Sequence, residues 1–189
     1  MKNRLRIFLP ALAFGPAALA RSKAPSVRFE TNMGDFIVVL NPDKAPVTVK
    51  NFLTYVSSGF YNDTVFHRVI RGFMVQGGGM TPDLEEKPAR APIRIESSNG
   101  LSNRRGTIAM ARTADPNSAT SQFFINVANN YFLDASRAAD GYGYTVFGTV
   151  THGMDVIDKI ALQRTQTRYG YDDVPIRSIV IRRSVLLNN

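Results

Sequence analysis

The sequence contains no cysteine and no tryptophan, and only two of its 189 residues are histidine. The absence of cysteine excludes disulfide bonds, thiol nucleophiles and thiolate metal sites, so the core alone has to stabilise the fold. His67 and His152 are far apart, and neither has a partner at the three- or four-residue spacing of a helical metal site. We therefore expect no metal centre.

Motifs for other common chemistries are also missing. The chain has no Gly-x-Ser-x-Gly sequence of the kind that presents a hydrolase nucleophile. Its glycine-rich stretch, Gly77–Thr81, lacks the lysine and the spacing of a phosphate-binding loop. No cofactor or nucleotide site is indicated.

Acidic residues are absent from the first twenty positions, which carry Lys2, Arg4 and Arg6. An apolar run from Ile7 to Leu19 follows and ends in the small-residue sequence Ala18-Leu19-Ala20. This layout is typical of a secretory signal peptide. We expect residues 1–20 to be the signal, 21–26 a linker and 27–189 a single domain.

A membrane anchor is the alternative for this segment. The apolar run is shorter than the ~20 residues that span a bilayer, and Pro10, Gly15 and Pro16 interrupt it. After cleavage we expect no membrane association, and nothing in the sequence requires more than a monomer.

The net charge of +8 falls to +5 when the three basic residues of the signal are removed. The arginines are scattered and do not form a basic run interleaved with aromatic residues, so a nucleic-acid partner is not expected. Salt-sensitive binding to oligonucleotides would test that alternative.

The apolar pattern predicts two helices and many short strands that form a closed all-β sheet. Val27–Thr31 and Phe36–Leu40 flank turn residues and are typical of a β-hairpin. A helix is expected from Pro46 to Gly59 and another from Met154 to Leu162, each with its apolar residues on one face. Further strands are expected at Val65–Ile70, Phe73–Gln76, Thr107–Ala111, Phe123–Val127, Thr145–Val150 and Ile176–Leu186, separated in part by long polar loops at 81–105 and 134–144.

Several motifs resemble the cyclophilin family. They are Val65-Phe66-His67-Arg68-Val69-Ile70, Arg71-Gly72-Phe73-Met74-Val75-Gln76-Gly77-Gly78, Gly106-Thr107-Ile108-Ala109-Met110-Ala111-Arg112, Asn117-Ser118-Ala119-Thr120-Ser121-Gln122-Phe123-Phe124-Ile125, Phe132-Leu133-Asp134 and Val146-Phe147-Gly148. With the signal peptide, the chain looks like the bacterial periplasmic branch. The resemblance implies a periplasmic peptidyl-prolyl cis-trans isomerase that acts on proline-containing polypeptides during the folding of exported proteins.

The resemblance also implies the fold and the site. The fold would be an all-β-dominated, eight-stranded antiparallel closed β-barrel capped by two α-helices, with the substrate groove outside the barrel. Arg68 would be the catalytic residue, donating to the imide nitrogen, and His67 would be a structural or groove-edge residue and not an acid or base. Substrate-binding residues would be Phe73, Met74, Gln76, Ala111, Arg112, Phe124, Phe132, Leu133 and Tyr144.

Three positions depart from many relatives. Phe132 stands where many eukaryotic members carry tryptophan, which removes an indole donor, so weak or no cyclosporin binding is expected. Tyr144 replaces a histidine, and Arg112 replaces an asparagine. The added charge of Arg112 suggests a preference for acidic or carbonyl-rich substrate segments.

Each residue also has an ordinary structural explanation. Arg68 could be a surface ion-pair partner, and Phe73, Met74 and Phe124 could simply belong to the core. The main functional rival is a binding module or holdase that grips proline-containing chains without needing turnover.

Overall fold

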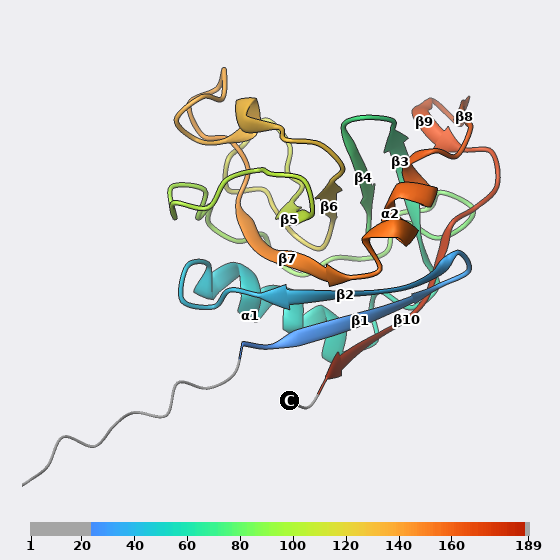
Figure 1. Cartoon of the computed structure of the whole chain (residues 1–189), viewed down its shortest axis with the longest axis horizontal. Helices are drawn as coiled ribbons and strands as arrows, with labels where there is room; N and C mark the ends of the chain where they lie inside the picture. Colours follow the sequence, from blue (N-terminus) through green and yellow to red (C-terminus); the bar gives the residue numbers. More distant parts are fainter. Residues whose placement is uncertain (1–23, 188–189) are drawn as a thin grey trace, which may run out of the picture.

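The computed structural model describes residues 24–187, so the predicted signal peptide and half of the predicted linker, residues 21–23, lie outside the described part. Eight strands close into an antiparallel barrel in the order β1-β10-β3-β4-β6-β5-β7-β2 (Figure 1). Together with two helices, this confirms the expected fold. The elements are β1 (Ser26–Thr31), β2 (Gly34–Leu40), α1 (Pro46–Ser57), β3 (Thr64–Ile70), β4 (Met74–Gly77), β5 (Thr107–Met110), β6 (Phe123–Asn126), the 3-10 helix η1 (Tyr131–Leu133), β7 (Val146–His152), α2 (Met154–Ala161), β8 (Thr165–Arg168), β9 (Tyr171–Pro175) and β10 (Val180–Leu187).

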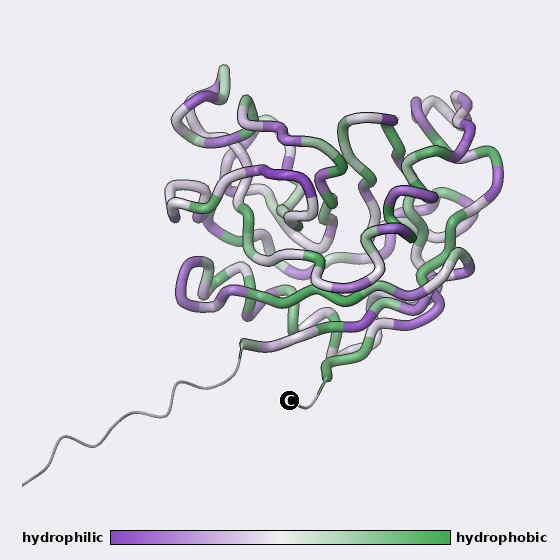
Figure 2. Tube along the Cα trace, viewed as in Figure 1, coloured by the Kyte–Doolittle hydropathy of each residue, from purple (hydrophilic) through white to green (hydrophobic). Residues whose placement is uncertain are grey.

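The barrel forms because successive side chains of a strand point to opposite faces, so one strand supplies both the interior and the outer surface. Along β1, hydrophilic and hydrophobic positions follow one another (Figure 2). Val27 and Phe29 of this strand are fully buried, whereas Arg28 and Glu30 lie outside and pair with each other at 2.6 Å.

Aromatic side chains fill the barrel interior. The ring of Phe123 lies 5.5 Å from the rings of Phe29 and Tyr61, 5.9 Å from Phe52 and 6.2 Å from Phe66. All five rings are at most 1% exposed. The interior is therefore a packed core and not a ligand cavity.

The two helices begin and end where the sequence predicts. Pro46 occupies the first turn of α1, where its missing N–H costs no hydrogen bond, and the helix stops just before Gly59 at φ 69°. Gly153 caps α2 at φ 77°, and a Cβ there would lie 2.3 Å from the Asp35 carbonyl oxygen. Glycine is thus required for α2 to approach β2.

Most strand boundaries agree with the sequence within two residues, and three differences are corrections. β1 begins at Ser26, the last residue assigned to the linker, because Ser26 pairs with Val39 and Leu187. The last strand starts at Val180 and not at Ile176. A second sheet, the β8–β9 hairpin, was not predicted.

The β8–β9 hairpin escaped prediction because its sequence is polar. β8 contains no apolar residue, and most of its residues are exposed. Within β9, Val174 is the buried apolar anchor, packing against Val65 of β3, Met80 and Leu84. Figure 1 shows the hairpin near the end of β3 that lies away from α1.

We predict that Phe123→Ala lowers the free energy of unfolding by about 3–5 kcal/mol, because it leaves a cavity among four aromatic rings. Urea unfolding followed by circular dichroism measures the change. Phe132→Ala is the matched control, since that ring is 58% exposed and should cost less than about 1 kcal/mol. Equal losses in the two variants would contradict the packed-core description.

Candidate active site

A β-bulge brings the two polar residues of the site together. Phe66 pairs with Gly77 and Arg68 with Gln76, so His67 is an extra residue in β3 that has no opposite partner in β4. Such a bulge redirects the side chains that follow it. Phe66 therefore points into the barrel, while Arg68 lies beside Gln76 on the outer face.

The outer faces of the neighbouring strands are apolar. Met74 of β4, Ala109 of β5, Phe124 of β6 and Val146 of β7 are at most 4% exposed and form a hydrophobic cluster separate from the barrel core. Six partly buried side chains extend it: Ile70, Phe73, Leu101, Ala111, Leu133 and Tyr144. Adjacent residues thus serve different clusters, with Phe123 inside and Phe124 outside.

Arg68 and six residues of this cluster line one groove of about 520 Å³. Nine of the ten residues predicted for the site line it: Arg68, Phe73, Met74, Gln76, Ala111, Arg112, Phe124, Leu133 and Tyr144. His67 also lines it, as expected for a groove-edge residue. The roles of these residues in binding and catalysis stay predictions.

Phe132 is the exception. Its side chain is not among those that line the groove and is 58% exposed, but its ring stacks on Phe73 at 5.7 Å with an interplanar angle of 24°. The cause is the 3-10 turn η1, which directs Leu133 towards the groove and Phe132 outwards. Phe132 therefore supports a groove residue instead of forming the wall.

Arg112 is buried, and this corrects the idea that its charge attracts acidic substrates. Its side chain is 3% exposed, and it donates to Gly143 O and Thr113 O at 2.9 Å each and to the Asp140 carboxylate. The guanidinium also lies 4.7 Å from the centre of the Tyr144 ring. Its positive charge is compensated, and the residue holds the wall of the groove.

The carboxylate of Asp140 is tied into the same wall. It accepts hydrogen bonds from the Arg112 side chain and from the backbone N–H groups of Tyr142 and Gly143, and these keep its pKa well below the usual range. Because its pKa is lowered, this stabilisation is present above about pH 4 and is lost as the pH falls.

A buried amide network fixes the segment that carries Leu133. Asn130 donates to Phe73 O at 2.9 Å and to the Asn126 side chain at 2.7 Å. Asn126 in turn donates to Thr107 and Asn103. This network could not be predicted from the sequence, because asparagine is common in solvated loops and its partners are distant in the chain.

Seven further groove residues were not predicted as site residues. Gln122 precedes β6 and accepts a 3.0 Å hydrogen bond from Gln76, and its position in the alternating pattern of that strand could have identified it. Five others come from the loop after β4 and from the unpredicted β8–β9 hairpin, for which no local signal exists. They are Met80, Glu86, Gly170, Tyr171 and Asp172, and His67 was predicted only at the edge.

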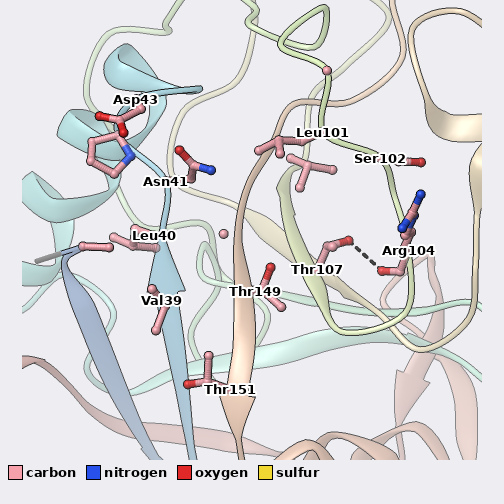
Figure 3. Close-up of a pocket in the computed structure, with 15 residues that line it drawn as sticks. Val39, Leu40, Asn41, Asp43, Leu101, Ser102, Arg104, Thr107, Thr149 and Thr151 are labelled. Carbon is pink, nitrogen blue, oxygen red and sulfur yellow. Dashed lines mark hydrogen bonds between the residues drawn. The ribbon is translucent and has the colours of Figure 1, made fainter.

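A larger depression of about 850 Å³ lies elsewhere on the barrel. In Figure 3, Val39 of β2 and Thr149 and Thr151 of β7 border it on one side, with Leu101 and Arg104 on the other. Thr107 there donates to the Arg104 carbonyl at 2.7 Å. None of the predicted site residues lines this depression, and no group of metal ligands occurs in residues 24–187.

The comparisons with known proteins decide the family. Residues 26–185 match the family described as cyclophilin type peptidyl-prolyl cis-trans isomerase/CLD. The chain belongs to the cyclophilin family. It is 50% identical to peptidyl-prolyl cis-trans isomerase A of Dickeya dadantii over 95% of this chain and 93% of the relative. It is 53% identical to isomerase B of Escherichia coli over 82% and 95%.

Solved structures agree with this assignment. A cyclophilin-type isomerase of Cryptosporidium parvum matches with a TM-score of 0.76 at 29% identity, over 88% of this chain and 99% of that one. The same protein, solved in the presence of the dipeptide Ala-Pro, matches with a TM-score of 0.74 at 30% identity, over 87% and 99%. The present cyclophilin is a peptidyl-prolyl cis-trans isomerase, and its family acts on proline-containing peptides. No helix in the described part of this cyclophilin is long and apolar enough to cross a membrane.

We predict that Arg112→Ala weakens peptide binding several-fold, because Tyr144 and the segment around Gly143 lose their shared anchor. Arg112→Lys keeps the charge but not the planar fork, so it should recover only part of the affinity. Titration of a short proline peptide, followed by NMR chemical shifts, measures the dissociation constant. Unchanged affinity in Arg112→Ala would show that the wall stands without this residue.

The buried His67 predicts a pH-dependent stability. Burial lowers its pKa from 6.5 to about 4, so the folded protein keeps the ring neutral while the unfolded chain is protonated below about pH 6.5. The free energy of unfolding should therefore fall as the pH drops from about 6.5 to about 4, by a few kcal/mol at about 1.4 kcal/mol per pKa unit. His67→Gln should remove this part of the pH dependence; identical pH profiles from urea unfolding would contradict it.

Proposed function

We propose that Arg68 is the catalytic residue of this isomerase and acts on the imide nitrogen of a bound X-Pro bond. The observation that carries the proposal is the position of this half-exposed guanidinium at the rim of a groove whose floor is Met74 and Phe124. A cation above an apolar floor suits a proline ring with a polar amide beside it.

The chemistry of the bond explains why a donor is needed there. Rotation about a peptide bond has a barrier of ~18–20 kcal/mol, because the nitrogen shares its lone pair with the carbonyl group. When the bond is twisted, the lone pair becomes localised on the nitrogen and can accept a hydrogen bond. A donor from Arg68 then stabilises the transition state more than either planar ground state, which is the condition for catalysis.

The apolar floor holds the ring while the rest of the substrate turns. Met74 and Phe124 are nearly fully buried beneath the groove, and Phe73, Leu133 and Tyr144 stand around it. Gln76 and the backbone near Ala111 are placed to hold the flanking peptide groups. The reaction needs no proton transfer and no covalent intermediate, and the relative solved with Ala-Pro supports a proline-containing ligand.

The required rate fits this kind of site. Uncatalysed isomerisation takes tens of seconds or longer, and shortening it to milliseconds is a factor of ~10⁴ or more, or roughly 5–7 kcal/mol. Hydrogen bonds to charged groups contribute about 1.5–3 kcal/mol, and exclusion of water from the groove strengthens them.

We further propose that the protein works on exported polypeptides in the periplasm. The support is in the sequence, where a basic start, a short apolar run and Ala18-Leu19-Ala20 have the order of a secretory signal. The absence of cysteine also makes the folded domain indifferent to an oxidising compartment. Weak cyclosporin binding is part of the proposal, because Phe132 offers no N–H donor and its ring faces away from the groove.

The experiment that tests the role of Arg68 is the cis/trans exchange rate of a short X-Pro peptide by NMR line shape. Arg68→Ala should lower kcat/KM by about 100-fold or more, while Arg68→Lys, which keeps the charge but loses the fork, should recover part of it. Circular dichroism and peptide titration serve as controls for folding and binding. Exchange at the full rate in Arg68→Ala would overturn the proposal, and binding without catalysed exchange in the parent protein would favour a holdase.

A further inference from the structure

We propose that Asp173 is a positioning residue for Arg68, and that the β8–β9 hairpin exists in part to present it. This inference rests on the proposed role of Arg68. The carboxylate Oδ2 of Asp173 lies 3.7 Å from Nε of Arg68, and these two charged groups come from different sheets.

The backbone of the hairpin is shaped to present this carboxylate. Asp173 has a φ of 60°, in the left-handed region that side chains other than glycine rarely adopt. Aspartate and asparagine tolerate this region better than most residues. The next residue, Val174, is buried in the packing beneath the hairpin. The irregular register between Gln166 and Arg168 adds to the local distortion.

The hairpin is fixed at both sides of Asp173. Val174 is 3% exposed and packs against Val65, which belongs to the same strand as Arg68. On the other side, Asp172 accepts a 2.7 Å hydrogen bond from Thr167 across the hairpin. The carboxylate is thus held at a set place relative to β3, although it is half-exposed.

The geometry of the contact matters more than its strength. A long arginine side chain on the surface samples many rotamers, and a carboxylate near Nε restricts them. Because the contact is made at Nε, the two terminal nitrogens of Arg68 stay available for the substrate. Asp173 therefore holds the guanidinium without occupying the nitrogens that donate.

The carboxylate of Asp173 affects the free energy of the transition state more than the binding of the substrate. Substrate is bound chiefly by the apolar floor and by backbone contacts, which do not depend on how Arg68 points. Loss of the orienting contact should therefore lower kcat more than it raises KM. The pair is exposed on both sides, so its loss should barely change stability.

Asp173→Asn is the most informative variant, since asparagine keeps the shape of the side chain and tolerates the left-handed backbone conformation but removes the charge. We expect kcat to fall about fivefold, with KM changed less than twofold, in an NMR line-shape assay on a short X-Pro peptide. The matched control is Asp155→Asn, which removes an exposed carboxylate that pairs with Lys159 on α2, away from the groove. It should leave kcat unchanged.

A double-mutant cycle with Arg68→Ala separates this inference from the proposed function. If Asp173 acts through Arg68, Asp173→Asn should have no further effect once Arg68 is alanine. Full activity of Arg68→Ala would instead defeat the role of the arginine itself. A normal kcat in Asp173→Asn, or a fivefold loss that persists in the Arg68→Ala background, would overturn the role of Asp173.

A second readout follows the guanidinium directly. The ¹⁵N relaxation of the Arg68 Nε–Hε group reports how strongly this side chain is ordered. Its order parameter should be lower in Asp173→Asn than in the parent protein, and unchanged in Asp155→Asn. Equal order in all three proteins would contradict an orienting contact.

Discussion

The structure depends on a closed barrel whose interior is filled by aromatic rings. Phe123 touches four other buried rings, so no peptide can enter the barrel. The binding surface has to be built from the opposite faces of the same strands. Strand alternation does this with adjacent residues, since Phe123 completes the core and Phe124 forms the floor of the groove.

The sequence predicts those parts of the fold in which periodicity and burial agree. The apolar spacing of α1 and the short apolar strands of the barrel were found because each has a clear pattern bounded by turn residues. The pattern also indicated a closed all-β sheet, but the number of its strands and the set of groove residues came from the resemblance to cyclophilins. Local pattern does not say which distant strands pair, so it could not have supplied them.

Features that depend on register or on polar contacts escaped the sequence. The bulge at His67 leaves no trace in hydropathy, yet without it Arg68 would not lie beside Gln76 on the outer face. The β8–β9 hairpin is polar and anchored by the single buried pair Val174 and Pro175, too little for a strand signal. The outward position of Phe132 also escaped the sequence, because a 3-10 turn directs neighbouring side chains differently from a strand.

Three arginines of this protein make different contacts, and these contacts decide which roles each can have. The side chain of Arg112 is buried, and its charge is paired with Asp140 and two carbonyl groups, so it holds the wall of the groove. Arg105 makes a two-pronged pair with Asp158 at 2.7 and 2.8 Å, which engages both terminal nitrogens. Either arrangement would disable a transition-state donor.

Arg68 differs from both in the way that its proposed task requires. Its acidic neighbour approaches Nε at 3.7 Å, close enough to bias the direction of the side chain and too far for a strong hydrogen bond. The lone pair of the imide nitrogen becomes an acceptor only when the bond is twisted. The guanidinium that donates to it has to be oriented before the reaction, yet its donating N–H groups must have no other strong hydrogen-bond partner until then. A weak pair at Nε meets both demands, because it leaves the two terminal nitrogens of Arg68 to donate, whereas a strong pair at the terminal nitrogens would meet only the first.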